Sequence, residues 1–254
     1  MKIRLMLAAL AGAALISGAG QAQMAPPLPT VPMLAPAGSH KLSVHVDALK
    51  SKHLMPDKYA FCAPAAQGHM GAGPDISPAI SWSKGPKGTL SYAIILYDTD
   101  SPAEQREKMN QEGMTVPATA KRQIFYHWLL VDIPANVNSL PEGAESQGRV
   151  PHGKPAADAK VGVRGTTTYS KIFAANEAMK GDYYGYDGPC PPWNDENTHH
   201  YHFTVYALSV KSLGLSGPFD SMAAQAAMQG KVLAQGEFLG YYSTNPAVIA
   251  KLPK

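Results

Sequence analysis

Residues 185–193 read Gly-Tyr-Asp-Gly-Pro-Cys-Pro-Pro-Trp, and residues 199–203 read His-His-Tyr-His-Phe. Proline fixes φ and removes an N–H donor, whereas glycine lets the backbone approach a ligand closely. A turn of this composition is rigid before anything binds, and here it leads into a segment that opens with histidine and tyrosine. The pattern favours a binding site over a purely structural loop.

The segments around this turn predict a strand-rich domain. Residues 90–97 are almost continuously apolar, as expected of a strand covered on both faces, and residues 124–133 form a second strand that ends at Pro134. Residues 199–208 alternate in polarity, which puts His199 and Tyr201 on one side. Weaker strands are expected at 42–47, 79–83 and 236–243.

Helices are expected to be few. The clearest covers residues 221–233, with Asp220 as its N-cap, and residues 168–179 form a shorter candidate. Many strands at hairpin-like spacing with few helices indicate a mainly β fold of the sandwich type.

The N-terminus has the features of an export signal. Lys2 and Arg4 precede an apolar run over 5–16 and a small-residue cleavage site at 20–22. We therefore expect a signal peptide at 1–22, a Pro-rich leader at 23–39, one domain at 40–254 and a periplasmic or secreted protein. The apolar run is short for a bilayer, so an uncleaved anchor is the alternative, and no later segment is long enough to span.

The charge balance argues against a nucleic-acid partner. The chain has 22 Lys and Arg against 19 Asp and Glu, and its first 22 residues contain two basic and no acidic residues. Removing them lowers the net charge from +3 to +1 and leaves no basic stripe for a polyanion.

Cys62 and Cys190 are the two cysteines of the chain. In an oxidising compartment an even pair predicts a disulfide, and two separate buried thiols are the alternative. A disulfide would tie the segment before Pro74 to the Gly/Pro-rich turn and stiffen it.

Several short motifs occur in a characteristic order. They are Pro-Asp-Ile-Ser-Pro-Ala-Ile-Ser-Trp at 74–82, Asp-x-Asp-x-Pro at 98–102, His-Trp at 127–128, Ile-Pro-Ala at 133–135, Gly-Pro-Cys-Pro-Pro at 188–192 and His-x-Tyr at 199–201. In this order the chain resembles the phosphatidylethanolamine-binding protein (PEBP) family, in its bacterial branch often called Raf kinase inhibitor-like. The resemblance covers about residues 43–242.

This resemblance implies a PEBP-like antiparallel β-sandwich of two sheets with a C-terminal helix and a few short helices. It also implies a pocket for a phosphate-like or other anionic group. Matched motif by motif, the pocket residues are Asp98, Asp100, His127, Gly188, Cys190, Pro191, His199 and Tyr201. The family match implies no metal and no cofactor.

Two carboxylates in an anion pocket need a physical explanation. Strand periodicity puts Asp98 and Asp100 on one side of the chain, where they could bond His127 and His199 and raise the pKa of both imidazoles. Alternatively, the carboxylates could hold the ammonium end of a zwitterion such as an ethanolamine headgroup. Both arrangements predict binding that weakens as pH rises through the range from about 5 to 8.

The sequence leaves open the roles of several residues around the expected pocket. Tyr186 and Trp193 are candidates for an aromatic rim, and His200 stands where the family commonly has arginine, which removes a permanent cation. The long polar segment 103–123 is either a lid or passive, and the Ser101–Pro102 bond is a candidate for the cis form.

The sequence therefore predicts an exported small-ligand-binding protein for phosphate-like or phosphoethanolamine-type groups. Two alternatives remain: a protein–protein inhibitor of a protease or kinase-like partner, and a metal-dependent hydrolase using Asp-x-Asp with two histidines. No G-x-S-x-G, P-loop, H-E-x-x-H or C-x-x-C motif is present, so no enzyme is expected.

Overall fold

A computed structural model describes residues 40–49, 53–156 and 159–252. The predicted signal peptide at 1–22 and leader at 23–39 lie outside the described residues, so both stay predictions.

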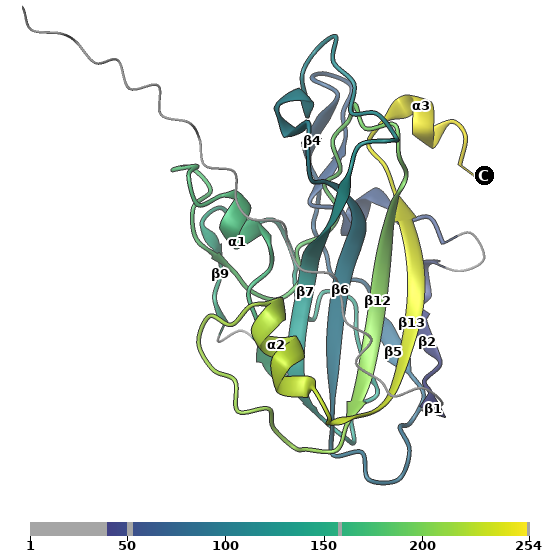
Figure 1. The fold of residues 1–254 in the computed structure, drawn as a ribbon, viewed down its shortest axis with the longest axis vertical. Helices are drawn as coiled ribbons and strands as arrows, with labels where there is room; N and C mark the ends of the chain where they lie inside the picture. The colour runs from purple at the N-terminus through teal and green to yellow at the C-terminus, as the bar shows by residue number, and fades with distance from the viewer. Residues whose placement is uncertain (1–39, 50–52, 157–158, 253–254) are drawn as a thin grey trace, which may run out of the picture.

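Four long strands form the centre of the fold and lie side by side in Figure 1. They are β6 (Ser91–Pro102), β7 (Arg122–Pro134), β12 (His199–Leu208) and β13 (Val232–Tyr242). Two short edge strands, β1 (His40–Lys41) and β10 (Val163–Arg164), complete a sheet of order β1-β13-β12-β6-β7-β10. β1 runs parallel to β13 and the other pairs are antiparallel, so the sheet is mixed rather than purely antiparallel.

Both faces of this sheet are covered. A second, three-stranded sheet of β2 (Val44–Val46), β5 (Ile80–Trp82) and β8 (Ser139–Leu140) packs on one face. The helix α2 (Ser221–Met228) packs on the other. Along β6, Ile94 and Leu96 point into the first core and Ala93 and Ile95 into the second. This double burial explains why residues 90–97 are continuously apolar.

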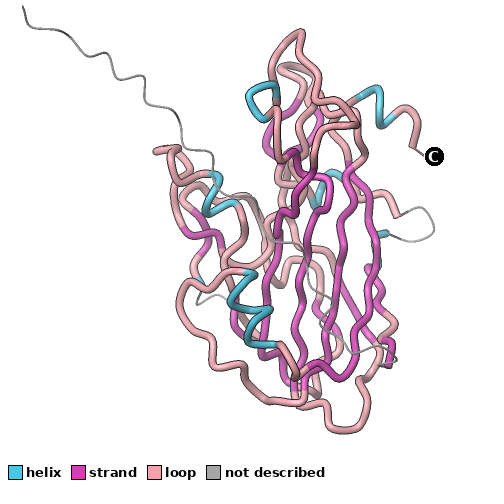
Figure 2. The backbone as a smooth tube through the Cα atoms, in the orientation of Figure 1, coloured by secondary structure: helices cyan, strands magenta, loops and turns pink. Residues whose placement is uncertain are grey.

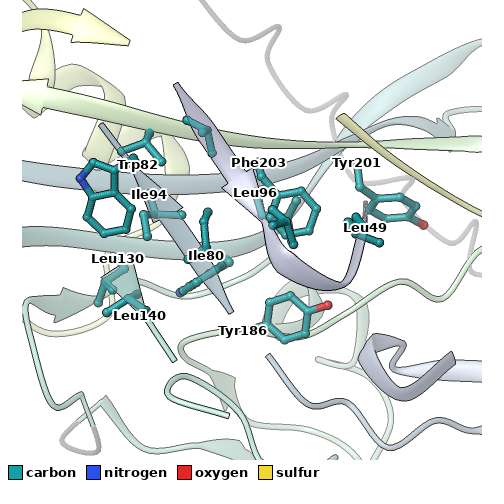
Figure 3. Close-up of a cluster of buried hydrophobic side chains, with 14 of the residues drawn as sticks. Leu49, Ile80, Trp82, Ile94, Leu96, Leu130, Leu140, Tyr186, Tyr201 and Phe203 are labelled. Atoms are coloured by element: carbon teal, nitrogen blue, oxygen red, sulfur yellow. The ribbon is translucent and has the colours of Figure 1, made fainter. Parts of the chain in front are cut away.

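The core between the two sheets is shown in Figure 3. Ile80 and Trp82 of β5 lie against Ile94 of β6, and Phe203 of β12 belongs to the same cluster. Each such side chain that leaves water contributes about 1.5–3 kcal/mol, so this layer supplies much of the force that joins the sheets. The predicted mainly β sandwich is confirmed.

The remaining elements are short, and Figure 2 shows how little of the chain is helical. The elements are β3 (Cys62–Pro64) paired with β4 (Met70–Ala72), β9 (Gly153–Lys154) paired with β11 (Asp182–Tyr183), α1 (Tyr169–Ile172), α3 (Pro246–Ile249), and 3-10 turns at Asp47–Leu49, Asp57–Tyr59 and Arg106–Lys108.

Both predicted helices are shorter than expected. Asp220 caps α2 as predicted, accepting the N–H groups of Met222 and Ala223, but the helix ends at Met228. Gly230, at φ 73°, turns the chain, and β13 begins two residues later. The second helix covers only Tyr169–Ile172 of the expected 168–179.

The disulfide between Cys62 and Cys190 is formed, with a Cα–Cα distance of 4.6 Å. The alternative of two separate buried thiols is therefore wrong. The Cys62 N–H also donates to the carbonyl of Pro189 at 3.0 Å. β3 and the Gly/Pro-rich turn are thus joined by a covalent bond and a backbone hydrogen bond at the same place.

Removing this disulfide should destabilise the fold without changing it. A cross-link over 128 residues contributes about 5 kcal/mol in the chain-entropy model. We expect Cys62→Ser/Cys190→Ser to lower the free energy of unfolding by a large part of that value in urea denaturation. Wild-type protein under reducing conditions is the control and should match the double variant. Equal urea midpoints for the variant and the oxidised wild type would contradict the prediction.

Candidate functional site

A pocket of about 300 Å³ opens where the carboxyl end of β6 meets the Gly/Pro-rich turn. Five of the eight predicted site residues line it: Asp98, His127, Cys190, Pro191 and His199. These residues come from three long strands and the turn, and the disulfide cysteines form part of the wall. The structure therefore brings together segments far apart in the chain, since the two cysteines of the wall are separated by 128 residues.

The polar inner end of the pocket centres on His199. Its Nδ1 bonds Asp98 Oδ2 at 2.7 Å and its Nε2 bonds Asp195 Oδ2 at 3.2 Å. Burial alone would lower the pKa of His199, but the two carboxylates outweigh that effect and raise the pKa to about 10. Arg122 in turn donates to both oxygens of Asp195, at 2.5 and 3.0 Å. His199 is therefore a cation with both N–H groups in use.

His127 is held differently, because its Nδ1 lies 2.8 Å from the carbonyl oxygen of Asp187. A carbonyl oxygen only accepts, so Nδ1 carries the hydrogen. The ring is 2% exposed and lies among the rings of Phe125, Tyr169 and Tyr201. Burial dominates here and lowers the pKa of His127 to about 4, against the opposing effect of Asp98. The imidazole is neutral, and Nε2 carries a lone pair.

These two environments correct the expectation that carboxylates bond both imidazoles. Asp98 bonds His199, whereas His127 bonds a backbone carbonyl. The pKa of one histidine lies above and that of the other below the range from about 5 to 8. The predicted loss of binding through titration of these imidazoles in that range is therefore not supported.

Asp98 and Asp100 do not share a side of the chain. The β6–β7 register shifts between Asp98 and Ser101, so β6 contains an extra residue there. Asp100 consequently turns away from the pocket and accepts from the N–H and Nδ1 of His200, at 3.0 and 2.9 Å. This hydrogen bond raises the pKa of His200. The Ser101–Pro102 bond is trans, so the expected cis form is wrong.

Gly188 and Tyr201 lie behind the pocket wall rather than in its lining. A Cβ on Gly188 would lie 1.9 Å from the carbonyl oxygen of Tyr59, so the turn packs there only as glycine. Tyr201 is fully buried beside His127, and its hydroxyl has no hydrogen-bond partner within the described residues.

The predicted aromatic rim is not formed as expected. Tyr186 is fully buried and donates to the carbonyl of Tyr59 at 2.6 Å, so it belongs to the core. Trp193 stacks on His69 with ring centroids 3.8 Å apart, outside the pocket lining. His200 is half-buried, and its Nδ1 bonds the Asp100 carboxylate.

Sequence reasoning missed several residues that shape the pocket. Its apolar wall contains Phe61, Phe125, Tyr169 and Phe173, and two arginines, Arg106 and Arg149, line it as well. Asp195, the second partner of His199, was also missed. Its position two residues after the Gly/Pro-rich turn and four before His199 was the one available signal.

In the described part of the chain, no group of three or more His, Cys, Asp or Glu side chains is arranged to hold a metal ion. Nor does any helix of residues 40–49, 53–156 or 159–252 have the length and apolar character needed to cross a bilayer.

The charged state of His199 makes stability depend on pH. Its folded pKa of about 10 lies above the ordinary value near 6.5, so its contribution is complete below pH 6.5 and is lost as pH rises towards 10. We expect the difference in free energy of unfolding between wild type and His199→Gln to shrink from pH 7 to 9. The slope should be at most about 1.4 kcal/mol per pH unit.

Urea denaturation at each pH measures this difference, and subtracting the variant cancels groups unaffected by the substitution. Parallel stability curves for the two proteins would contradict a charged His199.

The comparisons with known proteins bear on the family and the fold. A family model described as phosphatidylethanolamine-binding protein matches residues 45–243. The UPF0098 protein of Aquifex aeolicus is 31% identical over 171 residues, which are 67% of this chain and 75% of that protein. The UPF0098 protein YbcL of Escherichia coli is 30% identical over 156 residues, or 61% of this chain and 62% of that protein.

Solved structures show the same fold. The crystal structure of E. coli YbcL, described as a new member of the mammalian PEBP family, has a TM-score of 0.57 and 22% identity and covers 80% of this chain and 99% of that chain. The putative PEBP homologue CT736 from Chlamydia trachomatis has a TM-score of 0.52 and 25% identity, with 81% and 99% covered. The family model, which matches most of the chain, confirms the resemblance seen in the motifs, and the chain belongs to the phosphatidylethanolamine-binding protein family.

Proposed function

We propose that this protein is an exported small-ligand-binding protein whose pocket takes a compact headgroup of the phosphoethanolamine type. The observation that carries the proposal is the cavity of about 300 Å³ that Asp98, His127, Cys190, Pro191 and His199 line together. Its volume lies at the lower end of the range for small-molecule sites, which suits a headgroup better than a large ligand. The family description supports the same class of ligand.

The wall is suited to binding without rearrangement. Strands β6, β7 and β12 supply the inner residues, and the disulfide and prolines fix the turn. A site whose parts are ordered before binding loses less conformational entropy when a ligand enters.

The inner end offers acceptors rather than donors. The N–H groups of His199 are both bonded to carboxylates, and His127 presents the lone pair of Nε2. The Asp98 carboxylate accepts from His199 and from the Asp100 N–H at 2.7 Å and keeps further acceptor capacity. Of the two arrangements predicted from the sequence, this favours an ammonium or other donor at the inner end.

Replacing His127 should test this arrangement. We expect His127→Phe, which keeps an aromatic ring but removes the Nε2 acceptor, to weaken phosphoethanolamine binding at least tenfold, or about 1.4 kcal/mol. Isothermal titration calorimetry at pH 7.5 measures the affinity. The matched control is His45→Phe, since His45 is exposed on β2 and outside this pocket.

Two results would count against the proposed function. One is the absence of saturable binding of phosphoethanolamine, phosphate or acetate by the wild-type protein. The other is an unchanged affinity in His127→Phe that folds like wild type by circular dichroism.

Export is part of the proposal and rests on residues 1–22 of the sequence. We expect the protein recovered from a two-membrane bacterium in the periplasmic fraction to begin at Gln23. Intact-mass measurement checks this start, and a full-length chain in the cytoplasmic fraction would contradict it.

A further inference from the structure

A second cleft lies apart from the ligand pocket, over the long connection between β8 and β10. Its volume is about 530 Å³, which falls within the range for small-molecule sites. Segment 143–150 forms most of its wall, and Lys154, Pro155, Lys160 and Arg164 complete it. We call this site the loop cleft. Among the described residues, only Arg149 lines both the loop cleft and the ligand pocket.

The loop cleft has an excess of cationic side chains. Four line it, against the single carboxylate of Glu145 among its described residues: Arg149, Lys154, Lys160 and Arg164. Two buried aspartates and a backbone carbonyl already use the three N–H donors of Lys154. The other three cations remain to interact with a ligand.

Arg164 distinguishes the loop cleft from an ordinary basic surface. Its side chain is 4% exposed, and it donates from Nε to Glu145 Oε2 at 2.8 Å and from Nη2 to the carbonyl of Ala144 at 3.3 Å. A guanidinium has five N–H donors, so three have no partner within the described residues. Nη1 carries two of these and is not closed off from solvent. Because buried polar groups in folded proteins are almost always hydrogen-bonded, these donors indicate a place for an acceptor.

The fold holds Arg164 in one position. Its backbone pairs with Leu130 of β7, and its side chain passes Gly185 at the start of the Gly/Pro-rich turn. A Cβ on Gly185 would lie 3.0 Å from Arg164 Nε, so glycine leaves the space that the guanidinium fills. The facing loop is fixed as well, because the N–H groups of Glu145 and Ser146 donate to Ser77 Oγ at 3.0 and 3.2 Å. A ligand would therefore meet an ordered wall, which lowers the entropy lost on binding.

The carboxylate of Glu145 does not prevent an anion from entering. It is 2% exposed and bonded to Arg164. Burial raises the pKa of Glu145 despite this ion pair, which further reduces its negative charge.

We propose that the loop cleft is a second binding site, which takes the carboxylate or phosphate group of a small molecule. The planar guanidinium of Arg164 suits two oxygens of such a group, and Lys160 and Arg149 add positive charge. Ala144, Val150 and Pro155 give the same cleft an apolar part. A ligand with an apolar portion beside its oxyanion therefore fits best. The proposal does not depend on what the ligand pocket binds.

Nuclear magnetic resonance on the full mature protein separates the two sites. The backbone amides of Gly143 and Gly148 report on the loop cleft, and the amide of Cys190 reports on the ligand pocket. The probes are inorganic phosphate and phenyl phosphate, in about 0.15 M sodium chloride to screen general surface attraction. We expect saturable shifts at both glycines, with phenyl phosphate bound about threefold more tightly because its ring leaves water.

The test variant is Lys160→Gln/Arg164→Lys, which removes one charge and the guanidinium fork but keeps a cation beside Glu145. We expect the Kd of both probes at the two glycines to rise about tenfold, with the response at Cys190 unchanged within about twofold. Lys160→Gln alone guards against a folding defect, since Lys160 is exposed. It should raise the Kd about threefold at an unchanged melting temperature.

Lys211→Gln is the matched control, because it removes the same charge from an exposed lysine outside both sites. It should leave the Kd at the glycines within about twofold of wild type. An unchanged Kd in both cleft variants, or no saturable shift at the glycines of the wild-type protein, would overturn the second site. Shifts at the glycines without one at Cys190 would support it and count against the proposed function, so the two failures are distinguishable.

Discussion

Three buried charges hold the Gly/Pro-rich turn against the sheets, and the rest of the site depends on them. Lys154 lies between Asp75 and Asp187, and it also donates to the carbonyl of Tyr186 at 2.6 Å. Asp75 accepts the N–H of Gly188 at 2.7 Å. Burial, together with the nearby Asp187, raises the pKa of Asp75 to about 7. Removing the Lys154 ammonium would leave the two buried carboxyl groups without a cation, at a cost of about 3–5 kcal/mol.

This cluster links the turn to the pocket through Asp187. The backbone N–H of Asp187 donates to the carbonyl of His127 at 2.9 Å, and its own carbonyl accepts from the His127 ring. The orientation and tautomer of His127 are therefore fixed by a residue whose carboxylate is bound to Lys154. A mutation at position 154, which does not line this pocket, would act on the site through that connection.

The sequence correctly predicted those features of the structure that follow from one local rule. Continuous apolar character identified β6, alternation gave the bounds of β12, and an even cysteine pair predicted the disulfide. Sequence reasoning failed where a β-bulge interrupted the alternation of side chains along a strand. His127 is an extra residue of β7 between the pairs Leu96–Trp128 and Tyr97–Tyr126, and Asp100 lies in a similar shift on β6. A bulge depends on tertiary pairing, so strand periodicity could not reveal which way either side chain points.

The arginines were missed for a different reason. Arg106 lies in a polar segment without periodicity, and Arg149 in a loop, so neither had a motif that connected it with the pocket. Hydrogen bonds from Asn194 and Asn110 join segment 103–123 to the turn, and such contacts between distant loops are not encoded in a local pattern.

The fold constrains the pocket residues on strands more strongly than those on loops. The acceptors of the inner end are positioned mainly by strands, where a change of register would move every neighbouring side chain to the wrong face. The two arginines of the lining, Arg106 and Arg149, come from loops, which tolerate substitution and insertion far better. The inner residues are thus constrained by the register of the sheet, whereas the lining residues that come from loops are not.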